Sequence, residues 1–559
     1  MTTTSGVPGF RHLLILLLAM GVVLTATVVP GVFTTDDNNY LVNVLALRQG
    51  RITIAQSEGL TPSRELLFFD PAAWSRAVDT TPVASTAPPL YAPIALPFAL
   101  FGWRGLVVLN TLAYLAAVAM VFAYAARYSS DPLTPWFAAA AVGLGGYLIE
   151  YAQGVWPHGL SIALCTAGIL YAGRAIEDER PSYAVASGLL LAVATGVRYQ
   201  NAALLAATGA GLLFLARNRL KAAAAFMLAA FPPIAVVSVV NHLRLDSWNP
   251  ISKGPGYLSI APQGRVGSVL DRLVMFWARV VDFSIRPPQT GPFSEAWVTY
   301  DPTTGAHLMM GVTSQKSLLQ SAPWVVVALI AFVLAWSPWS SLDASQRRQL
   351  RLLSLPFFAL IGTFAVAGVD RSEGLAFNQR YLLELLPLAA IAFAWSLDKR
   401  RLSLRSFQIG AVIGGMLVLI IILGTPIGGG PGVPLWVARQ LAIFEVPLVL
   451  AAIVGTAWLL DRFGYKARLP LAAAAGACLA WGLMLHLSHD LVTSRWRRGL
   501  NLARTETLAE VLPNRSALVT YWGMKDAAVP LLFDHDLIIL DAHADGGRDA
   551  PILIREVLR

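Results

Sequence analysis

Apolar runs that are long enough to cross a lipid bilayer dominate this sequence. They recur from Leu13 to Leu487 and are separated by short loops. A membrane-spanning helix needs roughly 17 to 25 predominantly apolar residues. The runs are continuous and do not alternate between apolar and polar residues, so they predict helices and not the strands of a membrane barrel. The chain is therefore expected to fold as an all-α polytopic membrane protein.

The composition agrees with this interpretation. Of the 559 residues, 56% are hydrophobic and only 13% are charged, against roughly 25% charged residues in soluble domains. The formal net charge of +9 would suit nucleic acid, but the Lys and Arg residues lie between the apolar runs, which indicates topology. Both cysteines, Cys165 and Cys478, fall inside apolar runs, so neither a disulfide framework nor a Cys-rich metal site is expected.

The run lengths predict about thirteen crossings. The first, Leu13 to Val32, has no clear small-residue cleavage site and is expected to be an uncleaved span. The others are predicted at Gly105 to Ala126, Trp136 to Ile149, Pro157 to Gly173, Tyr183 to Val197, Asn201 to Ala216, Ala222 to His242, Ala322 to Trp339, Leu352 to Val369, Tyr381 to Leu397, Phe407 to Pro426, Leu441 to Leu460 and Pro470 to Leu487. Trp136 to Ile149 is short enough to be tilted or broken within the bundle.

The loops between these spans carry a charge bias that sets their orientation. If the N-terminus is cytoplasmic, every connection assigned to the cytoplasm is basic, as the positive-inside rule requires. Residues 33–89, 243–321 and the tail 488–559 then lie outside, and the C-terminus is extracytoplasmic. We expect a transmembrane domain over 1–487, including the two long outer loops, and a small extracytoplasmic α/β region over 488–559.

The outer segments have patterns of their own. Asp36 to Arg51 and Val266 to Ile285 mix apolar and charged residues at helical spacing, which predicts amphipathic helices, either at the membrane surface or packed on protein. The tail predicts a helix over Thr505 to Leu512, strands over Ala517 to Tyr521 and Leu537 to Leu540, and a closing helix over Ala550 to Leu558. About 70 residues fold alone only marginally, so this appendage is expected to dock on the outer loops.

Acidic and histidine residues gather in that tail. Asp541, His543 and Asp545 alternate, and Asp534, His535 and Asp536 lie nearby in the sequence. Their spacing matches no specific ligand motif, so a solvated strand end is favoured over a metal site.

Ionisable residues near span ends are the candidates for chemistry, because a charge near the bilayer centre costs about 2.5 to 3.5 kcal/mol. On the predicted outer side, these candidates are Asp36, Asp37, Glu150, His158, Arg198 and Arg380. Tyr381, which follows Arg380 directly, is considered with them. Carboxylates beside Arg and His can hold a phosphate and deprotonate a hydroxyl. The alternative is that Glu150 and Arg198 form a structural ion pair and that Arg380 extends its side chain toward the interface.

Several motifs, in order along most of the chain, resemble the GT-C glycosyltransferases. They are Asp36-Asp37-Asn38-Asn39-Tyr40 after the first span, Pro88-Pro89-Leu90-Tyr91-Ala92-Pro93, Leu109-Asn110, Asn249-Pro250, and Asn378-Gln379-Arg380-Tyr381-Leu382-Leu383 leading to Leu386-Pro387. The last is similar to the Arg-Tyr-Leu element of the branch that contains the protein mannosyltransferases and the aminoarabinose transferases. This chain has Arg198-Tyr199 where many relatives carry an Arg-Pro step.

The resemblance implies a GT-C-like fold and a membrane enzyme. The Ala-, Leu-, Gly- and Arg-rich composition suggests a bacterium, so the inner (plasma) membrane is the expected location. Such an enzyme moves a sugar from a polyprenyl-phosphate carrier to an extracytoplasmic acceptor, which is a cell envelope glycan, a lipid or a protein. Asp36 or Asp37 is the expected general base, with inversion at C1. Arg380 is the first candidate for the donor phosphate, followed by Arg198 and Lys253. Other candidates for the pocket are Tyr40, Glu150, His158 and Tyr381.

The adjacent carboxylates of Asp36 and Asp37 also permit a divalent ion such as Mg²⁺, Mn²⁺ or Ca²⁺, but only two neighbouring ligands are visible. Direct base catalysis is therefore the preferred hypothesis, and no other cofactor is indicated. The pair could also cap a helix, and both roles are compatible.

Other functions are compatible with a multi-span chain. A secondary transporter or lipid-linked sugar flippase would suit the intramembrane charges, but it predicts two similar halves, and no internal repeat is found. An O-antigen ligase or polymerase would be expected to carry its main catalytic loop late in the chain. A receptor or scaffold would need no pair of carboxylates.

Overall fold

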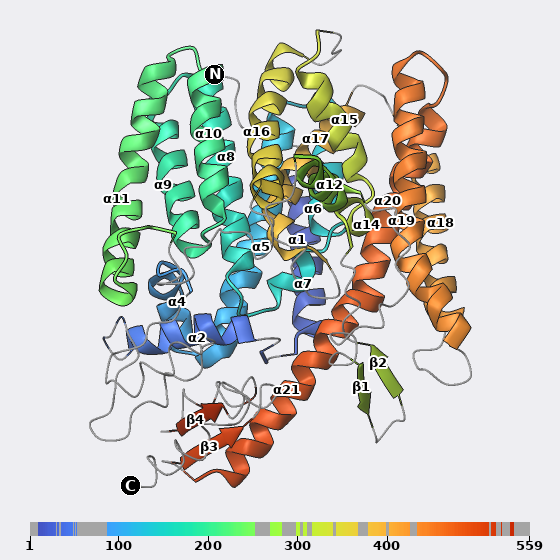
Figure 1. Ribbon diagram of the computed structural model, residues 1–559. Coiled ribbons are helices and arrows are strands. Elements are labelled where there is room, and N and C mark those ends of the chain that lie inside the picture. Colours follow the sequence, from blue (N-terminus) through green and yellow to red (C-terminus); the bar gives the residue numbers. More distant parts are fainter. Residues whose placement is uncertain are drawn as a thin grey trace.

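The structure is a computed structural model, and its described residues form a bundle of helices with a small region at one end (Figure 1). The described residues are 9–29, 31–32, 35–48, 50, 52, 87–251, 269–281, 298–301, 306–309, 316–338, 343–366, 378–398, 402–424, 433–513, 516–520, 527, 531 and 537–541. Some side chains within these ranges are not described, including that of Asp36, those of residues 433–444 and those of the four strands.

Seven helices in the described part are long and apolar enough to cross a membrane. They involve α5 (Gly102–Arg127), α8 (His158–Asp178), α11 (Arg219–Leu245), α16 (Ala344–Val366), α17 (Leu386–Leu397) preceded by the 3-10 turn η2 (Arg380–Leu385), α18 (Leu404–Gly424) and α20 (Arg468–Leu485). Shorter apolar helices are α1 (Phe10–Thr27), α9 (Pro181–Val197), α10 (Asn201–Leu215) and α15 (Val325–Ala335), and α19 (Val433–Arg462) adds a long one. Within the described residues, each predicted span coincides largely with helix, so the helical membrane fold is confirmed, while the number of crossings stays a prediction.

The span predicted over Trp136 to Ile149 is broken. Helix α6 (Thr134–Gly143) ends before α7 (Leu148–Ala152) begins. Gly145 lies at this break, where its carbonyl accepts a hydrogen bond from Trp324 Nε1 at 2.8 Å. A Cβ at Gly145 would lie 2.7 Å from the Leu479 side chain. This close packing fixes α7 inside the bundle and thereby places Glu150.

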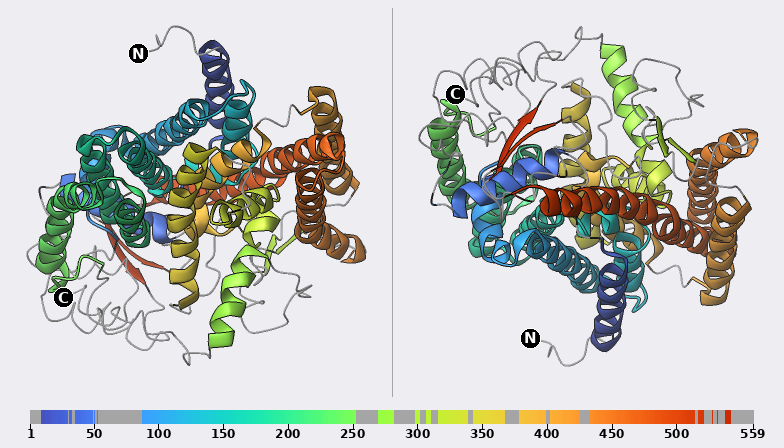
Figure 2. Two further views of the ribbon diagram at one scale, coloured as in Figure 1. Left: turned by 90° about the horizontal axis from the view of Figure 1, so that it is seen from above. Right: turned by 90° about the horizontal axis from the view of Figure 1, so that it is seen from below.

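One end of the bundle carries the segments that are predicted to lie outside. Helices α2 (Thr35–Arg48) and α4 (Tyr91–Ala99) lie there, and α21 (Leu491–Val511) crosses the same end (Figures 1 and 2). Leu508 of α21 shares a hydrophobic cluster with Leu41 and Val44 of α2. Beyond α21, strands β3 (Ser516–Thr520) and β4 (Leu537–Asp541) pair in parallel, with Ser516 opposite Leu537. The tail thus docks through α21 on the first outer segment.

The second long outer segment supplies short elements. They are α12 (Val269–Val280), the antiparallel strands β1 (Val298–Asp301) and β2 (Ala306–Met309), and α14 (Leu318–Ser321). Helix α12 is amphipathic as predicted, because its exposed Leu270, Leu273, Val274 and Trp277 lie on one face, whereas Arg279 is buried on the opposite one. A π-helical turn, η3 (His486–Asp490), connects α20 to α21.

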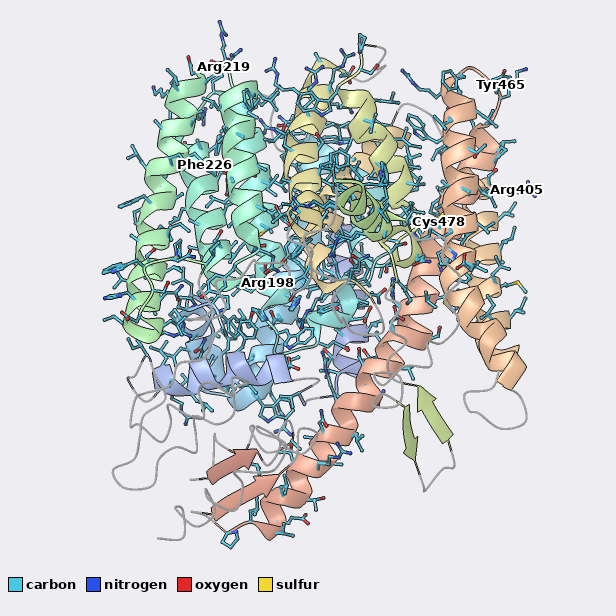
Figure 3. The ribbon with its side chains drawn as sticks, in the orientation of Figure 1. Arg198, Arg219, Phe226, Arg405, Tyr465 and Cys478 are labelled. Carbon is cyan, nitrogen blue, oxygen red and sulfur yellow. The ribbon has the colours of Figure 1, made fainter. Side chains whose placement is uncertain are left out.

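Arg219, which belongs to one of the basic connections, lies at the end opposite to α2, as does Tyr465 (Figure 3). The protein is an integral membrane protein, and the assignment of this end to the cytoplasm stays a prediction. The predicted closing helix and the tail residues Asp534, His535, Asp536, His543 and Asp545 lie outside the described residues.

Candidate functional site

Asp37 lies buried in the first turn of α2. Its side chain is 1% exposed, and a helix N-terminus favours a negative charge at this position. The Tyr40 ring of the same helix meets the Tyr91 ring edge-to-face, with centroids 5.4 Å apart. Burial raises the pKa of Tyr91 above its usual value, and the neighbouring Tyr40 and Asp37 add to that shift. Asp36 shares the turn, but its side chain is not described.

The connection between α7 and α8, residues 153–157, forms a buried wall beside these tyrosines. The Tyr91 hydroxyl donates a hydrogen bond to the Val155 carbonyl at 2.9 Å. Asn110 Nδ2 donates to the Gly154 carbonyl at 2.9 Å, and Asn110 Oδ1 accepts from the Leu160 amide at 3.1 Å. The asparagine of the Leu109-Asn110 motif therefore fixes both ends of this connection.

Arg380 lies against the other side of the connection. Its guanidinium is 5.2 Å from the centroid of the Trp156 ring and 4.9 Å from that of Tyr381. His158 stacks beside Trp156 and Tyr151, with ring centroids 4.9 and 4.8 Å away. His158 is 4% exposed, and neither of its ring nitrogens has a hydrogen-bond partner among the described residues. A cation and an unpaired imidazole thus meet at one aromatic wall.

Arg198 belongs to a closed ion pair. Its Nη1 lies 2.7 Å from Glu384 Oε1, and the two side chains are 3% and 0% exposed. The Ser161 hydroxyl donates to the same carboxylate oxygen at 2.7 Å. The expected alternative, an ion pair between Glu150 and Arg198, is therefore wrong, because Glu384 neutralises this guanidinium. Arg198 Nη2 also donates to the Arg380 carbonyl at 3.4 Å, so the pair supports the backbone of Arg380.

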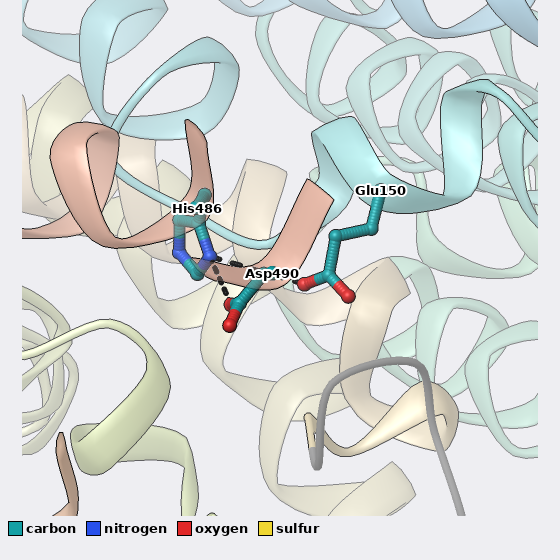
Figure 4. Close-up of side chains that lie close together, drawn as sticks. All are labelled: Glu150, His486 and Asp490. Atoms are coloured by element: carbon teal, nitrogen blue, oxygen red, sulfur yellow. Dashed lines mark hydrogen bonds and ion pairs between the residues drawn. The ribbon is translucent and has the colours of Figure 1, made fainter. Parts of the chain in front are cut away.

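Glu150 instead joins a buried polar cluster at the junction of α7 and η3 (Figure 4). His486 Nδ1 lies 2.5 Å from Asp490 Oδ2 and 3.8 Å from Glu150 Oε1. Asn378 Nδ2 donates to Glu150 Oε1 and, at 2.9 Å, to Asp490 Oδ2. Lys316 Nζ donates to Asp490 Oδ1 at 3.2 Å. All five side chains are fully buried.

This cluster is compatible with a divalent cation. Glu150, His486 and Asp490 each offer one ligand atom, and these atoms lie within 4.8 Å of one another. Glu150 Oε2 and Asn378 Oδ1 have no hydrogen-bond partner among the described residues, which leaves two further oxygens for such an ion. The ammonium of Lys316 already gives Asp490 a cationic partner, so the cluster holds its charges without a metal.

Burial raises the pKa of Glu150 above its usual 4.5, and the Asp490 charge adds to that shift, whereas Lys316 and Asn378 oppose it. A carboxyl with a raised folded-state pKa stabilises the fold fully below 4.5, and this contribution is lost as the pH rises through the folded-state pKa. We therefore expect Glu150→Gln to weaken the fall in unfolding temperature on going from about pH 5 to pH 8.

Thermal unfolding of the detergent-solubilised protein across that pH range measures the effect. Glu506→Gln is the matched control, because Glu506 is exposed on α21. An equal pH dependence in the native protein and in Glu150→Gln would contradict a neutral Glu150 in the fold.

The structure groups Asp37 with Tyr40, and Arg380 with His158 and Tyr381, whereas Lys253 lies outside the described residues. Sequence reasoning missed the cluster partners Lys316, His486 and Asp490, and also Glu384 and Arg498. Of these partners, only His486 and Asp490 carried a sequence signal. Their i,i+4 spacing at the end of a span could have indicated that they contact each other.

No protein-family model and no curated protein sequence matches the chain. Among solved structures, the chain is similar to ArnT from Cupriavidus metallidurans bound to undecaprenyl phosphate, at a TM-score of 0.51 and 14% identity over 95% of this chain and 86% of that chain. ArnT in the apo state gives a TM-score of 0.50 at 15% identity over the same shares. The apo oligosaccharyltransferase of Archaeoglobus fulgidus gives 0.45 at 10% identity, over 96% and 65%. The two ArnT structures show that the chain shares their overall fold.

Proposed function

We propose that the protein is an integral membrane glycosyltransferase that moves a sugar from a polyprenyl-phosphate carrier to an acceptor on the extracytoplasmic side. One observation carries this proposal. The connection over 153–157 contacts the surroundings of Asp37 through Val155 and contacts Arg380 through Trp156. A buried carboxylate and a cation therefore share one wall, as the transfer of a sugar from a phosphate to a hydroxyl requires.

The fold and two basic groups support the proposed donor class. The chain shares its fold over 95% of its length with ArnT, which was solved with undecaprenyl phosphate bound. The guanidinium of Arg380 suits a phosphate, because its planar fork can bind two oxygens at once. His158 stands at the start of α8, and its unpaired ring nitrogens offer a second donor. The hydrocarbon chain of the carrier would lie between the helices.

The proposed reaction is a single displacement. The acceptor oxygen attacks C1 of the sugar while its proton passes to the Asp37 carboxylate. The bond between C1 and the phosphate oxygen breaks, and the polyprenyl phosphate leaves with the bonding electron pair. Arg380 stabilises the charge that grows on this leaving group. Attack from the face opposite to the phosphate inverts the configuration at C1.

Other predicted site residues take supporting roles in this proposal. Arg198 is neutralised by Glu384 and holds the Arg380 carbonyl, so we assign it to positioning and not to the phosphate. Tyr381 contacts the Arg380 guanidinium. Lys253 is proposed as a further phosphate contact from the second outer segment.

A reconstituted transfer assay tests the proposal. Purified protein in lipid is given a panel of labelled sugars on undecaprenyl phosphate, with candidate envelope acceptors, with and without a chelator. We expect the native protein to transfer at least one sugar, and Arg380→Gln to lower kcat by about 10² to 10³-fold, because the leaving phosphate loses its cation.

Arg104→Gln is the matched control for that variant. The Arg104 guanidinium also lies 5.2 Å from a Trp ring centroid, that of Trp103, but its side chain is exposed. Equal rates for the Arg380 and Arg104 variants would reject the assigned role. Native protein that transfers no sugar yet moves the lipid across the bilayer would favour the flippase hypothesis. Loss of transfer with chelator would indicate a divalent cation.

A further inference from the structure

Helix α21 belongs to the tail, yet it packs on the link between α1 and α2. It crosses the end of the bundle next to α2 (Figure 2). Asn501 Nδ2 donates to the Val32 carbonyl at 2.9 Å. Gly31 has a φ of 150°, and a Cβ at this position would lie 2.7 Å from the Arg498 carbonyl oxygen. The chain therefore enters α2 in direct contact with α21, a few residues before Asp37.

The side chain of Arg498 extends from this contact to the wall of the site. It is 3% exposed, and its Nη1 donates to the Gln153 carbonyl at 2.6 Å. A Cβ at Gly154 would lie 2.8 Å from its Nη2. One residue of the tail thus touches both the segment that leads into Asp37 and the connection that contacts Arg380.

The charged groups around this guanidinium also connect Arg498 with Asp37. Burial lowers the pKa of Arg498, while Asp37, then Glu150 and Tyr151 raise it. Asp37 is the strongest of these charged neighbours. Buried cations are retained where a carboxylate or hydrogen bonds compensate them, and here both Asp37 and the Gln153 carbonyl do so.

We propose that Arg498 is a positioning residue that holds the Asp37 carboxylate and the 153–157 connection in register, so that the tail completes the active site. This inference rests on the proposed function. A carboxylate near a cation stays ionised to lower pH, so it is ready to accept the proton of the acceptor. The catalytic centre would then need α21 as well as the membrane bundle.

Three variants of the full-length protein test this role. Arg498→Gln is expected to lower kcat about a hundredfold through misplacement of the base. Its acidic limb in the pH profile of transfer should move to higher pH, because Asp37 loses a neighbouring cation. Arg498→Lys should restore the position of that limb but only part of the rate, since one ammonium cannot replace the planar fork. Arg495→Gln, on the exposed side of α21, should leave both unchanged.

Other groups could also shape this profile. Tyr40 from α2, Tyr91 from α4, and Glu150 and Tyr151 from α7 act on the same region. The tyrosines stay neutral through the acidic range. The pH profiles are therefore repeated with Arg498 and with Arg498→Gln in a Glu150→Gln background. If the acidic limb still moves when the Arg498 charge is lost, that limb belongs to Asp37.

Two results would overturn the proposal. Arg498→Gln that remains folded and transfers at the native rate would exclude any positioning role, and a slow Arg498→Gln with an unmoved acidic limb would reduce Arg498 to a structural residue. If native protein transfers no sugar, the proposed function fails, and a double-mutant cycle in unfolding temperature judges the contact separately. Additive losses for Asp37→Asn and Arg498→Gln would reject the contact, whereas non-additive losses would retain it.

Discussion

Asp37→Asn is expected to lower the rate of sugar transfer by about 10² to 10⁴-fold, the usual contribution of a general base. The amide has nearly the shape of the carboxylate but cannot accept the acceptor proton. Because Asp37 is 1% exposed, little bulk water reaches its position to replace it as a base. Initial rates with saturating donor and acceptor, on protein that elutes as the native protein does in size exclusion, measure the loss.

Asp36→Asn is the matched control, with the same chemical change one residue earlier in the same helical turn. We expect it to retain most of the activity, because Asp37, which is buried and whose charge acts on Tyr91 and Arg498, is the assigned base. If Asp36→Asn is inactive and Asp37→Asn is active, the base is Asp36. If both variants transfer normally, the acidic pair only caps α2 and the proposed mechanism is wrong.

Most of the fold could be predicted from the sequence, because the thickness of a bilayer fixes the length of an apolar helix. The short apolar run predicted that the span at α6 and α7 could be broken. It did not predict the cause of the break. That cause is the packing of Gly145 against Leu479 and Trp324. These residues lie far apart in the sequence, and the sequence gives no measure of their distance.

The site could be predicted less completely. The cost of a charge in the membrane correctly marked Glu150, His158, Arg198 and Arg380 as unusual residues, and all four take part in buried or aromatic contacts. Their partners were not predictable, because spans that are apolar all round do not reveal which face meets which neighbour. Arg198 therefore pairs with Glu384 and not with Glu150.

The contacts of His486 and Asp490 with Glu150 could not be predicted for a second reason. The apolar run ends between them, so the sequence assigns one to a span and the other to the tail. In the structure the π-helical turn η3 brings both onto Glu150. Single-turn π-helices occur often at functional sites, but no residue pattern here distinguishes η3 from the α-helix before it.

The Lys316 and Asp490 pair carries the largest expected effect on stability. Both side chains are 0% exposed and lie 3.2 Å apart, and the pair joins the end of the second outer segment to the start of the tail. Lys316→Met keeps the length of the side chain but leaves a buried carboxylate without its cation. Breaking such a pair costs about 3 to 5 kcal/mol. We expect a strongly lowered unfolding temperature and a poor yield of monodisperse protein.

The double variant Lys316→Met/Asp490→Asn separates the charge from the packing. The introduced amide would be neutral and could still hydrogen-bond to His486 and Asn378, so most of the lost stability should return. Lys466→Met, at an exposed position, controls for the loss of one positive charge and should unfold at the native temperature. If the double variant is as unstable as Lys316→Met, the Lys316 ammonium stabilises the fold through its packing and hydrogen bonds and not through its charge. A fully stable Lys316→Met would mean that Asp490 is neutral in the fold, with the proton and not the lysine balancing this cluster.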